Sequence, residues 1–265
     1  TLGVDRPSAL PPDPPMSAEP ETPVAADPVM TLTEHLSELR LRIFIGLLAI
    51  GIGTIVGWFL APYAINLLKA PIAGPLVFTA PSGAFFLQLK LALMIGVALA
   101  SPVVLYELWA FVSPGLTPHE RRVARPWVPM ALVFLVLGIG VAYLILPATI
   151  GFLLGFAIPG VIEPLITTDA YFGFVTTMFL AFALVMQFPI VIVLLNKVGI
   201  VSADRLKRGR RYVLVGIFVV AVVVTPGGDP FSPVVMAAVM YPLYEFTIWL
   251  VSRSERRSGR SITAD

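Results

Sequence analysis

The chain contains no cysteine, which excludes disulfide bonds, iron–sulfur clusters and thiolate zinc sites. It has only two histidines, His35 and His119, and both lie outside the apolar runs, so a histidine-based metal or catalytic centre within a membrane is excluded as well. Charged residues make up 13% of the chain, against about 25% in ordinary soluble domains. The net charge of +2 is too small to indicate a nucleic-acid partner.

Apolar residues are abundant instead, at 57% of the chain with a mean hydropathy of +0.90, which indicates a membrane protein. Apolar runs of about 20 residues suffice to cross a bilayer, and the chain has several. The fifth run has only 14 residues, roughly 21 Å of helix, so local thinning of the membrane is expected around it. Six spans are predicted, at residues 41–61, 85–108, 127–146, 171–195, 212–225 and 233–251.

The spans define three parts of the chain. Residues 1–29 hold eight prolines and no apolar run, so a disordered tail is predicted there. Residues 30–251 are predicted to form the membrane domain, which opens with a short amphipathic surface helix over 31–40. Residues 252–265 are predicted to be a basic tail.

The distribution of cations predicts the orientation. Six spans place both termini on one side, and that side receives sixteen of the eighteen Lys and Arg residues, with only Lys69 and Lys90 on the other. Because cytoplasmic loops carry the excess of Lys and Arg, both termini are predicted to be cytoplasmic.

Three carboxylates, Glu38, Glu107 and Glu120, fall at the predicted cytoplasmic surface. They could be solvated partners of nearby arginines, and Glu38 precedes Arg42 by one helical turn, the favourable order for an ion pair. They could instead accept guanidinium groups from a ligand, because a carboxylate binds arginine in a two-pronged geometry that lysine cannot match. Such a site would distinguish arginine from lysine.

Gln187 and Asp229 also have two interpretations each. An amide within a span usually hydrogen-bonds to a neighbouring helix, although a functional role for Gln187 is possible. For Asp229, which lies in a tight turn, a helix cap or Asx-turn is favoured over an ion site. The spans contain no nucleophile with a base, no paired aspartates and no metal ligand set, so no enzymatic activity and no cofactor are expected.

Proline-broken spans, with Pro102, Pro189 and Pro242, would also suit a secondary transporter of a small solute or ion. That alternative lacks an ionisable residue near the middle of the membrane, where transporters usually carry one.

Several motifs resemble the TatC family, the multi-spanning subunit of the twin-arginine (Sec-independent) protein translocase. MTLTEHLSELRLR matches its opening motif, WAFVSPGLTPHERR its first cytoplasmic loop, and QFPIVIVLL its fourth span. TPGGDPFSP and YPLYE match its last two spans, so the resemblance runs from Met30 to about Val251.

The resemblance implies an all-α, cup-shaped bundle of six transmembrane helices in a bacterial inner membrane, which binds twin-arginine signal peptides of folded proteins. It implies TatA-like and TatB-like single-span partners along the last two spans, self-association in the complex, transport driven by the proton-motive force, and no nucleotide. Docking of the partners would involve Thr225 and Asp229. Signal-peptide binding would involve Glu38, Arg40, Phe111, Pro114, Glu120, Arg121 and Gln187.

Three positions depart from the family pattern. Gln187 stands where a glutamate is usual, so hydrogen bonding to a signal peptide is retained there without an ionisable carboxylate. Pro233 replaces a common glutamine, and Gly83 replaces a frequent acidic residue. No function is assigned to Gly83 or to its loop.

Overall fold

The structure is a computed structural model that describes residues 32–72, 74–115, 121–122, 125–158, 161, 164–197, 199–225 and 228–257. The predicted N-terminal tail therefore lies outside the described residues. The chain divides into two units, residues 1–37 and 38–265, and the second unit forms a helical bundle.

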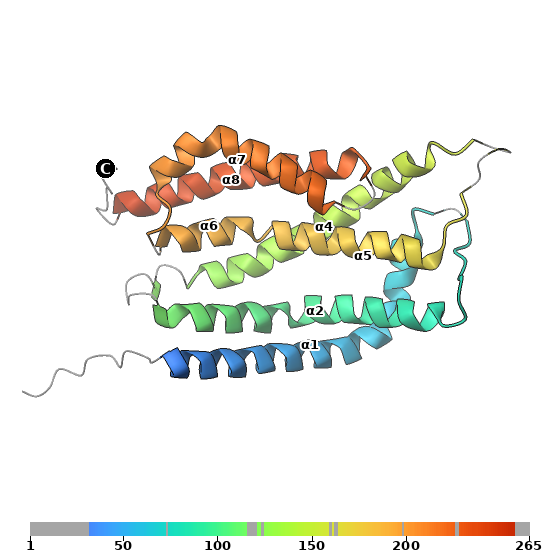
Figure 1. Ribbon diagram of the computed structural model, residues 1–265, viewed down its shortest axis with the longest axis horizontal. Helices are drawn as coiled ribbons and strands as arrows, with labels where there is room; N and C mark the ends of the chain where they lie inside the picture. Colours follow the sequence, from blue (N-terminus) through green and yellow to red (C-terminus); the bar gives the residue numbers. More distant parts are fainter. Residues whose placement is uncertain are drawn as a thin grey trace, which may run out of the picture. The chain divides into compact units, whose positions relative to one another are not determined.

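The regular secondary structure of the described residues is helical, apart from one isolated β-bridge between Val77 and Thr167 that joins two loops. The short 3₁₀ turn η1 follows α2 directly (Figure 1). The elements are α1 (Leu32–Lys69), α2 (Gly83–Val112), η1 (Ser113–Gly115), α4 (Trp127–Leu154), α5 (Thr168–Val185), α6 (Phe188–Lys197), α7 (Ala203–Val224) and α8 (Phe231–Arg257).

Within the residues that the structure describes, five stretches are long and apolar enough to cross a membrane: α1, α2, α4, the pair α5 and α6 taken together, and α8. This confirms the prediction of an all-helical membrane protein. The remaining predicted span is α7, which falls outside that group because its first half carries five cations between Arg205 and Arg211. Its apolar part is the short run that follows Arg211.

Several helices extend further than predicted. The amphipathic segment and the first span form one helix, α1, which continues past Pro62 to Lys69, and α4 continues past Pro147 to Leu154. A membrane tolerates proline inside a helix because the helix keeps its other backbone hydrogen bonds, and apolar surroundings offer no alternative partners. In Figure 1, α1 changes direction towards its C-terminal end, where Pro62 lies.

Helix α7 begins at Ala203, nine residues before the predicted span, so most of the predicted basic loop is helical. The hydroxyl of Ser202 accepts a hydrogen bond from the backbone N–H of Arg205 at 3.3 Å, and Asp204 lies in the first turn. Both features stabilise a helix N-terminus. The predicted break in the fourth span is confirmed, because α5 ends at Val185 and α6 begins at Phe188, just before Pro189.

Glycines allow α1 and α2 to pack with their backbones almost touching. A Cβ atom added at Gly53 would lie 2.6 Å from the backbone oxygen of Gly96, and one added at Gly57 would collide with the backbone oxygen of Ala92. Small residues are commonly found where membrane helices approach this closely. This contact holds the first two helices side by side, as Figure 1 shows.

The centre of the bundle is α5. In the apolar 18-residue stretch of α5 and α6, half of the residues are buried, compared with 11% of the residues in the corresponding stretch of α1. Phe172, Met178 and Phe182 of α5 are fully buried together with Leu91 of α2. The α7–α8 pair is joined by the hydroxyl of Tyr244, which donates to the backbone oxygen of Leu206 at 2.8 Å.

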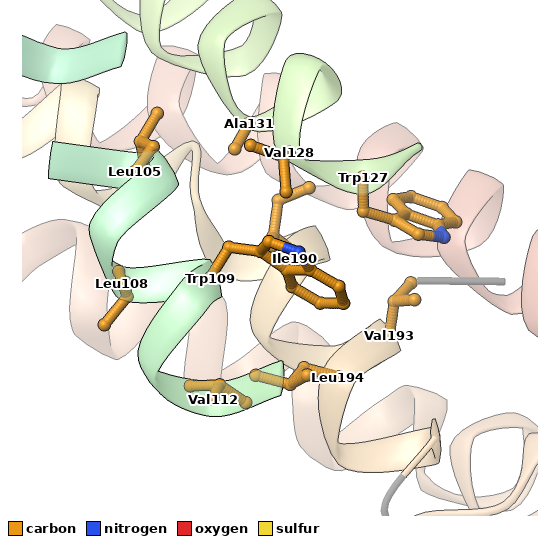
Figure 2. A pocket seen from close by; sticks show the side chains of 10 residues that line it. All are labelled: Leu105, Leu108, Trp109, Val112, Trp127, Val128, Ala131, Ile190, Val193 and Leu194. Atoms are coloured by element: carbon orange, nitrogen blue, oxygen red, sulfur yellow. The ribbon is translucent and has the colours of Figure 1, made fainter. Parts of the chain in front are cut away.

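A cleft that is partly open to the surroundings lies between α2, α4 and α6 (Figure 2). Its walls are apolar and include two of the four tryptophans. The lining residues include Leu105 and Trp109 of α2, Trp127 and Val128 of α4, and Ile190 and Leu194 of α6.

One end of the bundle collects most of the cations. The C-terminal ends of α2, α6 and α8 and the N-terminal ends of α4 and α7 meet there in Figure 1. Arg121 and Arg125 precede α4, the five cations of α7 follow Ala203, and Arg253 lies near the end of α8. Lys69 is the last residue of α1 and Lys90 lies near the start of α2, so both lie away from the cation-rich end.

Candidate functional site

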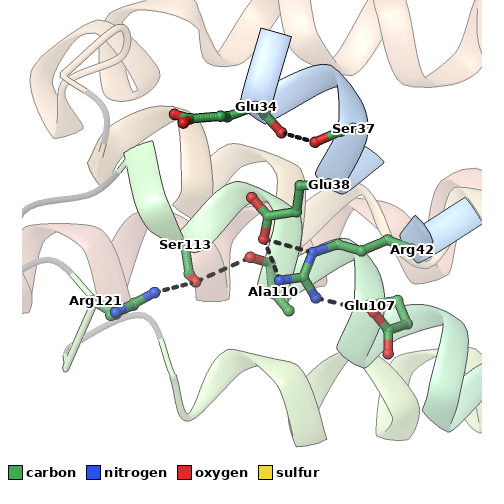
Figure 3. A network of polar contacts seen from close by, with 8 residues as sticks. All are labelled: Glu34, Ser37, Glu38, Arg42, Glu107, Ala110, Ser113 and Arg121. Carbon is green, nitrogen blue, oxygen red and sulfur yellow. Dashed lines mark hydrogen bonds and ion pairs between the residues drawn. The ribbon is translucent and has the colours of Figure 1, made fainter. Parts of the chain in front are cut away.

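The carboxylate cluster, defined as Glu38 and Arg42 of α1 with Glu107 of α2, lies near the cation-rich end (Figure 3). Both Nε and Nη2 of Arg42 donate to Oε1 of Glu38, with the Nε contact at 3.0 Å. Nη1 of Arg42 donates to Oε2 of Glu107, also at 3.0 Å. The predicted ion pair within α1 is therefore confirmed, and Glu107 is a second partner of the same guanidinium.

The three side chains of the cluster are largely shielded from solvent, with exposed fractions of 17% for Glu38, 24% for Arg42 and 14% for Glu107. Charge-assisted hydrogen bonds are stronger in such surroundings than at an open surface. Both carboxylates bond to the same guanidinium through different N–H groups, so the cluster is suited to hold a planar guanidinium.

Arg121 lies at the end of α2, although it follows α2 by nine residues in the sequence. Its Nη2 donates to the hydroxyl of Ser113 at 2.8 Å, and that hydroxyl donates to the backbone oxygen of Ala110 at 3.3 Å. Ser113 is buried, whereas Arg121 is exposed. A cation is thereby held at the C-terminal end of α2, where the helix dipole favours positive charge.

Three further residues predicted for this surface lie on the same helices. Arg40 is exposed on α1, Phe111 is half-buried in the last turn of α2, and Pro114 is exposed in η1. Glu120 lies outside the described residues. Among the described residues, no group of His, Cys, Asp or Glu could hold a metal ion.

Comparisons with known proteins identify the family. A family model described as "Sec-independent protein translocase protein (TatC)" matches residues 34–238, well over half of the chain. The chain belongs to the TatC family.

Individual TatC proteins agree with this assignment. The chain is 37% identical over 225 residues to the Sec-independent protein translocase protein TatC of Carboxydothermus hydrogenoformans, a match that covers 83% of this chain and 92% of that protein. It is 39% identical over 232 residues to the chloroplastic protein of Pisum sativum, covering 86% of this chain and 65% of the pea protein. A crystal structure titled "Twin Arginine Translocase Receptor- TatC in DDM" superimposes with a TM-score of 0.70 at 34% identity, covering 82% of this chain and 99% of the other.

The other site residues predicted for this TatC protein do not lie on α1 or α2, the two helices that carry the carboxylate cluster. Gln187, in the turn between α5 and α6, donates through Nε2 to the backbone oxygen of Ala131 on α4 at 3.1 Å. This is the helix-to-helix hydrogen bond that the sequence suggested as the ordinary role of an amide in a span. Ala131 also lines the apolar cleft.

Thr225 and Asp229, predicted to dock TatC partners, are buried with exposed fractions of 8% and 3%. The hydroxyl of Thr225 donates to the backbone oxygen of Ala221 at 2.6 Å. Oδ1 of Asp229 accepts from the backbone N–H of Ser232 at 2.7 Å, which confirms the predicted cap at the start of α8. Both side chains shape the α7–α8 turn from within.

Two carboxylates have contacts that the sequence did not reveal. Glu107 lies 65 residues from its partner Arg42, and only the pairing of α1 with α2 brings them together. Glu255 of α8 accepts from Nδ2 of Asn196 at 2.8 Å and from the backbone N–H of Ala203 at 3.0 Å. The second contact places a carboxylate at the N-terminus of α7, where the helix dipole stabilises negative charge. Knowing where α7 begins would have allowed a search of the sequence for such a carboxylate.

Proposed function

We propose that this TatC protein is the receptor core of a twin-arginine translocase and binds the paired arginines of signal peptides at its carboxylate cluster. The observation that supports this most directly is the cluster itself, in which two shielded carboxylates from different helices already bind one guanidinium. The crystal structure that superimposes on this chain is titled a twin-arginine translocase receptor, which is consistent with the proposal.

The chemistry of the cluster accounts for a preference for arginine. Arg42 already bridges Glu38 and Glu107 with three N–H groups, a geometry that an ammonium group cannot reproduce. An incoming guanidinium would bind the carboxylates in the same two-pronged way. Glu120 would contribute a further carboxylate. Arg40, Phe111, Pro114 and Arg121 would border the bound peptide, and Gln187 would offer an amide to the part that enters the membrane.

The proposed orientation places the cation-rich end of the bundle in the cytoplasm, in accordance with the positive-inside rule. A bacterial inner membrane is the proposed location. Signal peptides would therefore meet the carboxylate cluster before they cross the membrane, and export would be driven by the proton-motive force.

We further propose that TatA-like and TatB-like single-span partners pack along α7 and α8, and that copies of the chain associate in the complex. The apolar part of α7 exposes Val215, Phe218 and Val223, with exposed fractions between 50% and 77%. Because Thr225 and Asp229 are buried, they would act by holding the α7–α8 turn in shape rather than by direct contact.

The test is photo-crosslinking in membranes, from a probe at position 120 to a signal peptide that carries Arg-Arg or Lys-Lys. Crosslinking of the Arg-Arg peptide alone is expected, and it should fall sharply in Glu38→Gln. Asp204→Asn is the matched control, because Asp204 also pairs with a cation of its own helix, Lys207, at the same end of the bundle. Equal crosslinking of both peptides, or no effect of Glu38→Gln, would contradict the proposed site.

A further inference from the structure

None of the residues that line the apolar cleft between α2, α4 and α6 is assigned to the signal-peptide site proposed above. Its walls come from three helices, and Figure 2 shows that Trp109 of α2 and Trp127 of α4 both line it. Within a bilayer, the abundant molecules that fill such an apolar space are lipid acyl chains.

The rim of the cleft is cationic. Nη2 of Arg121 lies 2.8 Å from the hydroxyl of Ser113, the residue that follows the lining residue Val112. Arg125 is exposed two residues before the lining residue Trp127, and its backbone oxygen accepts from the N–H of Val128 at 3.3 Å. Within the part of the chain that the structure describes, neither arginine forms an ion pair.

One carboxylate lies near the α6 side of the rim. Asn196 follows the lining residue Leu194 by two positions and donates to Oε1 of Glu255. The same oxygen accepts from the backbone N–H of Ala203, so this carboxylate is stabilised by two donors and by the N-terminus of α7. The rim as a whole therefore favours an anionic group over a cationic one.

We infer that the cleft binds an anionic phospholipid, with one acyl chain between Trp109 and Trp127 and the phosphate at Arg121 and Arg125. Tryptophan rings are common at the level of the headgroups, and basic residues between membrane helices on the cytoplasmic side bind anionic headgroups. The charge of the rim decides between lipids, because Arg121 and Arg125 favour an anionic headgroup over a zwitterionic one. This inference concerns the chain without any signal peptide and does not depend on the proposed receptor function.

The tryptophans allow a direct test with lipids that are brominated on their acyl chains and quench indole fluorescence on contact. The protein carries Trp58→Phe and Trp249→Phe, so that only Trp109 and Trp127 report. It is reconstituted in phosphatidylcholine vesicles that contain a rising fraction of brominated phosphatidylglycerol or brominated phosphatidylcholine. We expect saturable quenching by brominated phosphatidylglycerol. Its quenching should be half complete at a lower mole fraction than that of brominated phosphatidylcholine, by about fivefold for each arginine that contacts the phosphate.

Val128→Phe should fill the cleft and abolish the saturable component. Val133→Phe is the matched control, because it makes the same change on the same helix at a residue that is 50% exposed and does not line the cleft. Arg121→Gln with Arg125→Gln should leave acyl-chain quenching in place but remove the preference for phosphatidylglycerol. If Val128→Phe does not fold, this double variant decides the question.

Equal, non-saturable quenching by both lipids would overturn the inference, as would saturable quenching that persists in folded Val128→Phe. Saturable quenching by a twin-arginine peptide with a brominated apolar segment, in the absence of any phosphatidylglycerol effect, would assign the cleft to the peptide and overturn it too.

Discussion

Nη1 of Arg42 on α1 lies 3.0 Å from Oε2 of Glu107 on α2, and this ion pair joins the two helices beside the region proposed to receive signal peptides. Arg42 also holds Glu38, so one guanidinium positions both carboxylates. Changes at Arg42 and at Glu107 should therefore have different consequences.

Glu107→Gln should weaken the binding of an Arg-Arg signal peptide by about tenfold to a hundredfold, because it removes a carboxylate charge from the cluster and a charge-assisted hydrogen bond is worth about 1.5–3 kcal/mol. Titration of a fluorescent peptide into the protein in nanodiscs measures this. Asp204→Asn, which changes an exposed carboxylate at the same end, should bind as the unmodified chain does. Unchanged affinity in Glu107→Gln would remove Glu107 from the site.

Arg42→Lys should destabilise the protein by about 1–2 kcal/mol, because an ammonium group cannot keep the contacts to Glu38 and Glu107 at once. The shift is read from thermal unfolding in detergent. Arg40→Lys is the control, since Arg40 is exposed on the same helix and its replacement should change little. A stability of Arg42→Lys equal to that of the control would mean that the bridge contributes nothing measurable.

Gly53→Leu should separate α1 from α2, because the new side chain would begin 2.6 Å from the backbone oxygen of Gly96 and backbone cannot move aside cheaply. Overpacking of this kind costs about 1–3 kcal/mol or more. Gly51→Leu is the matched control, since no atom lies within 4 Å of a Cβ added there. Thermal unfolding distinguishes the two, and equal stability of both variants would show that the helices are not packed through Gly53.

Glu255→Ala should loosen the connection between α6 and α7, because Asn196 and the N–H of Ala203 lose their acceptor. Hydrogen exchange at the Ala203 amide should accelerate by about tenfold, as expected for the loss of roughly 1.4 kcal/mol. Glu255→Gln keeps an oxygen acceptor and should exchange more slowly than Glu255→Ala. If the two variants exchange alike, the hydrogen bonds are not what holds this segment.

The sequence predicted which segments form helices, but it often did not predict where those helices end. Pro62 and Pro147 were expected to end their helices, yet α1 and α4 continue past both, because a low-polarity environment penalises broken backbone hydrogen bonds more than a proline does. Pro189 did coincide with a break between α5 and α6. The Ser202 cap, which was not predicted, places the start of α7 in what looked like a basic loop.

The amino-acid sequence by itself determined that this is a polytopic helical membrane protein, which family it resembles, and that Glu38 pairs with Arg42, because hydropathy, motifs and one-turn spacing are local properties of a chain. Tertiary structure alone decided that Glu107 shares Arg42, that Glu255 caps α7, and that Trp109 and Trp127 face one cleft. These contacts join residues far apart in the chain, and their distances depend on how closely the glycines let the helices approach and on which helices become neighbours.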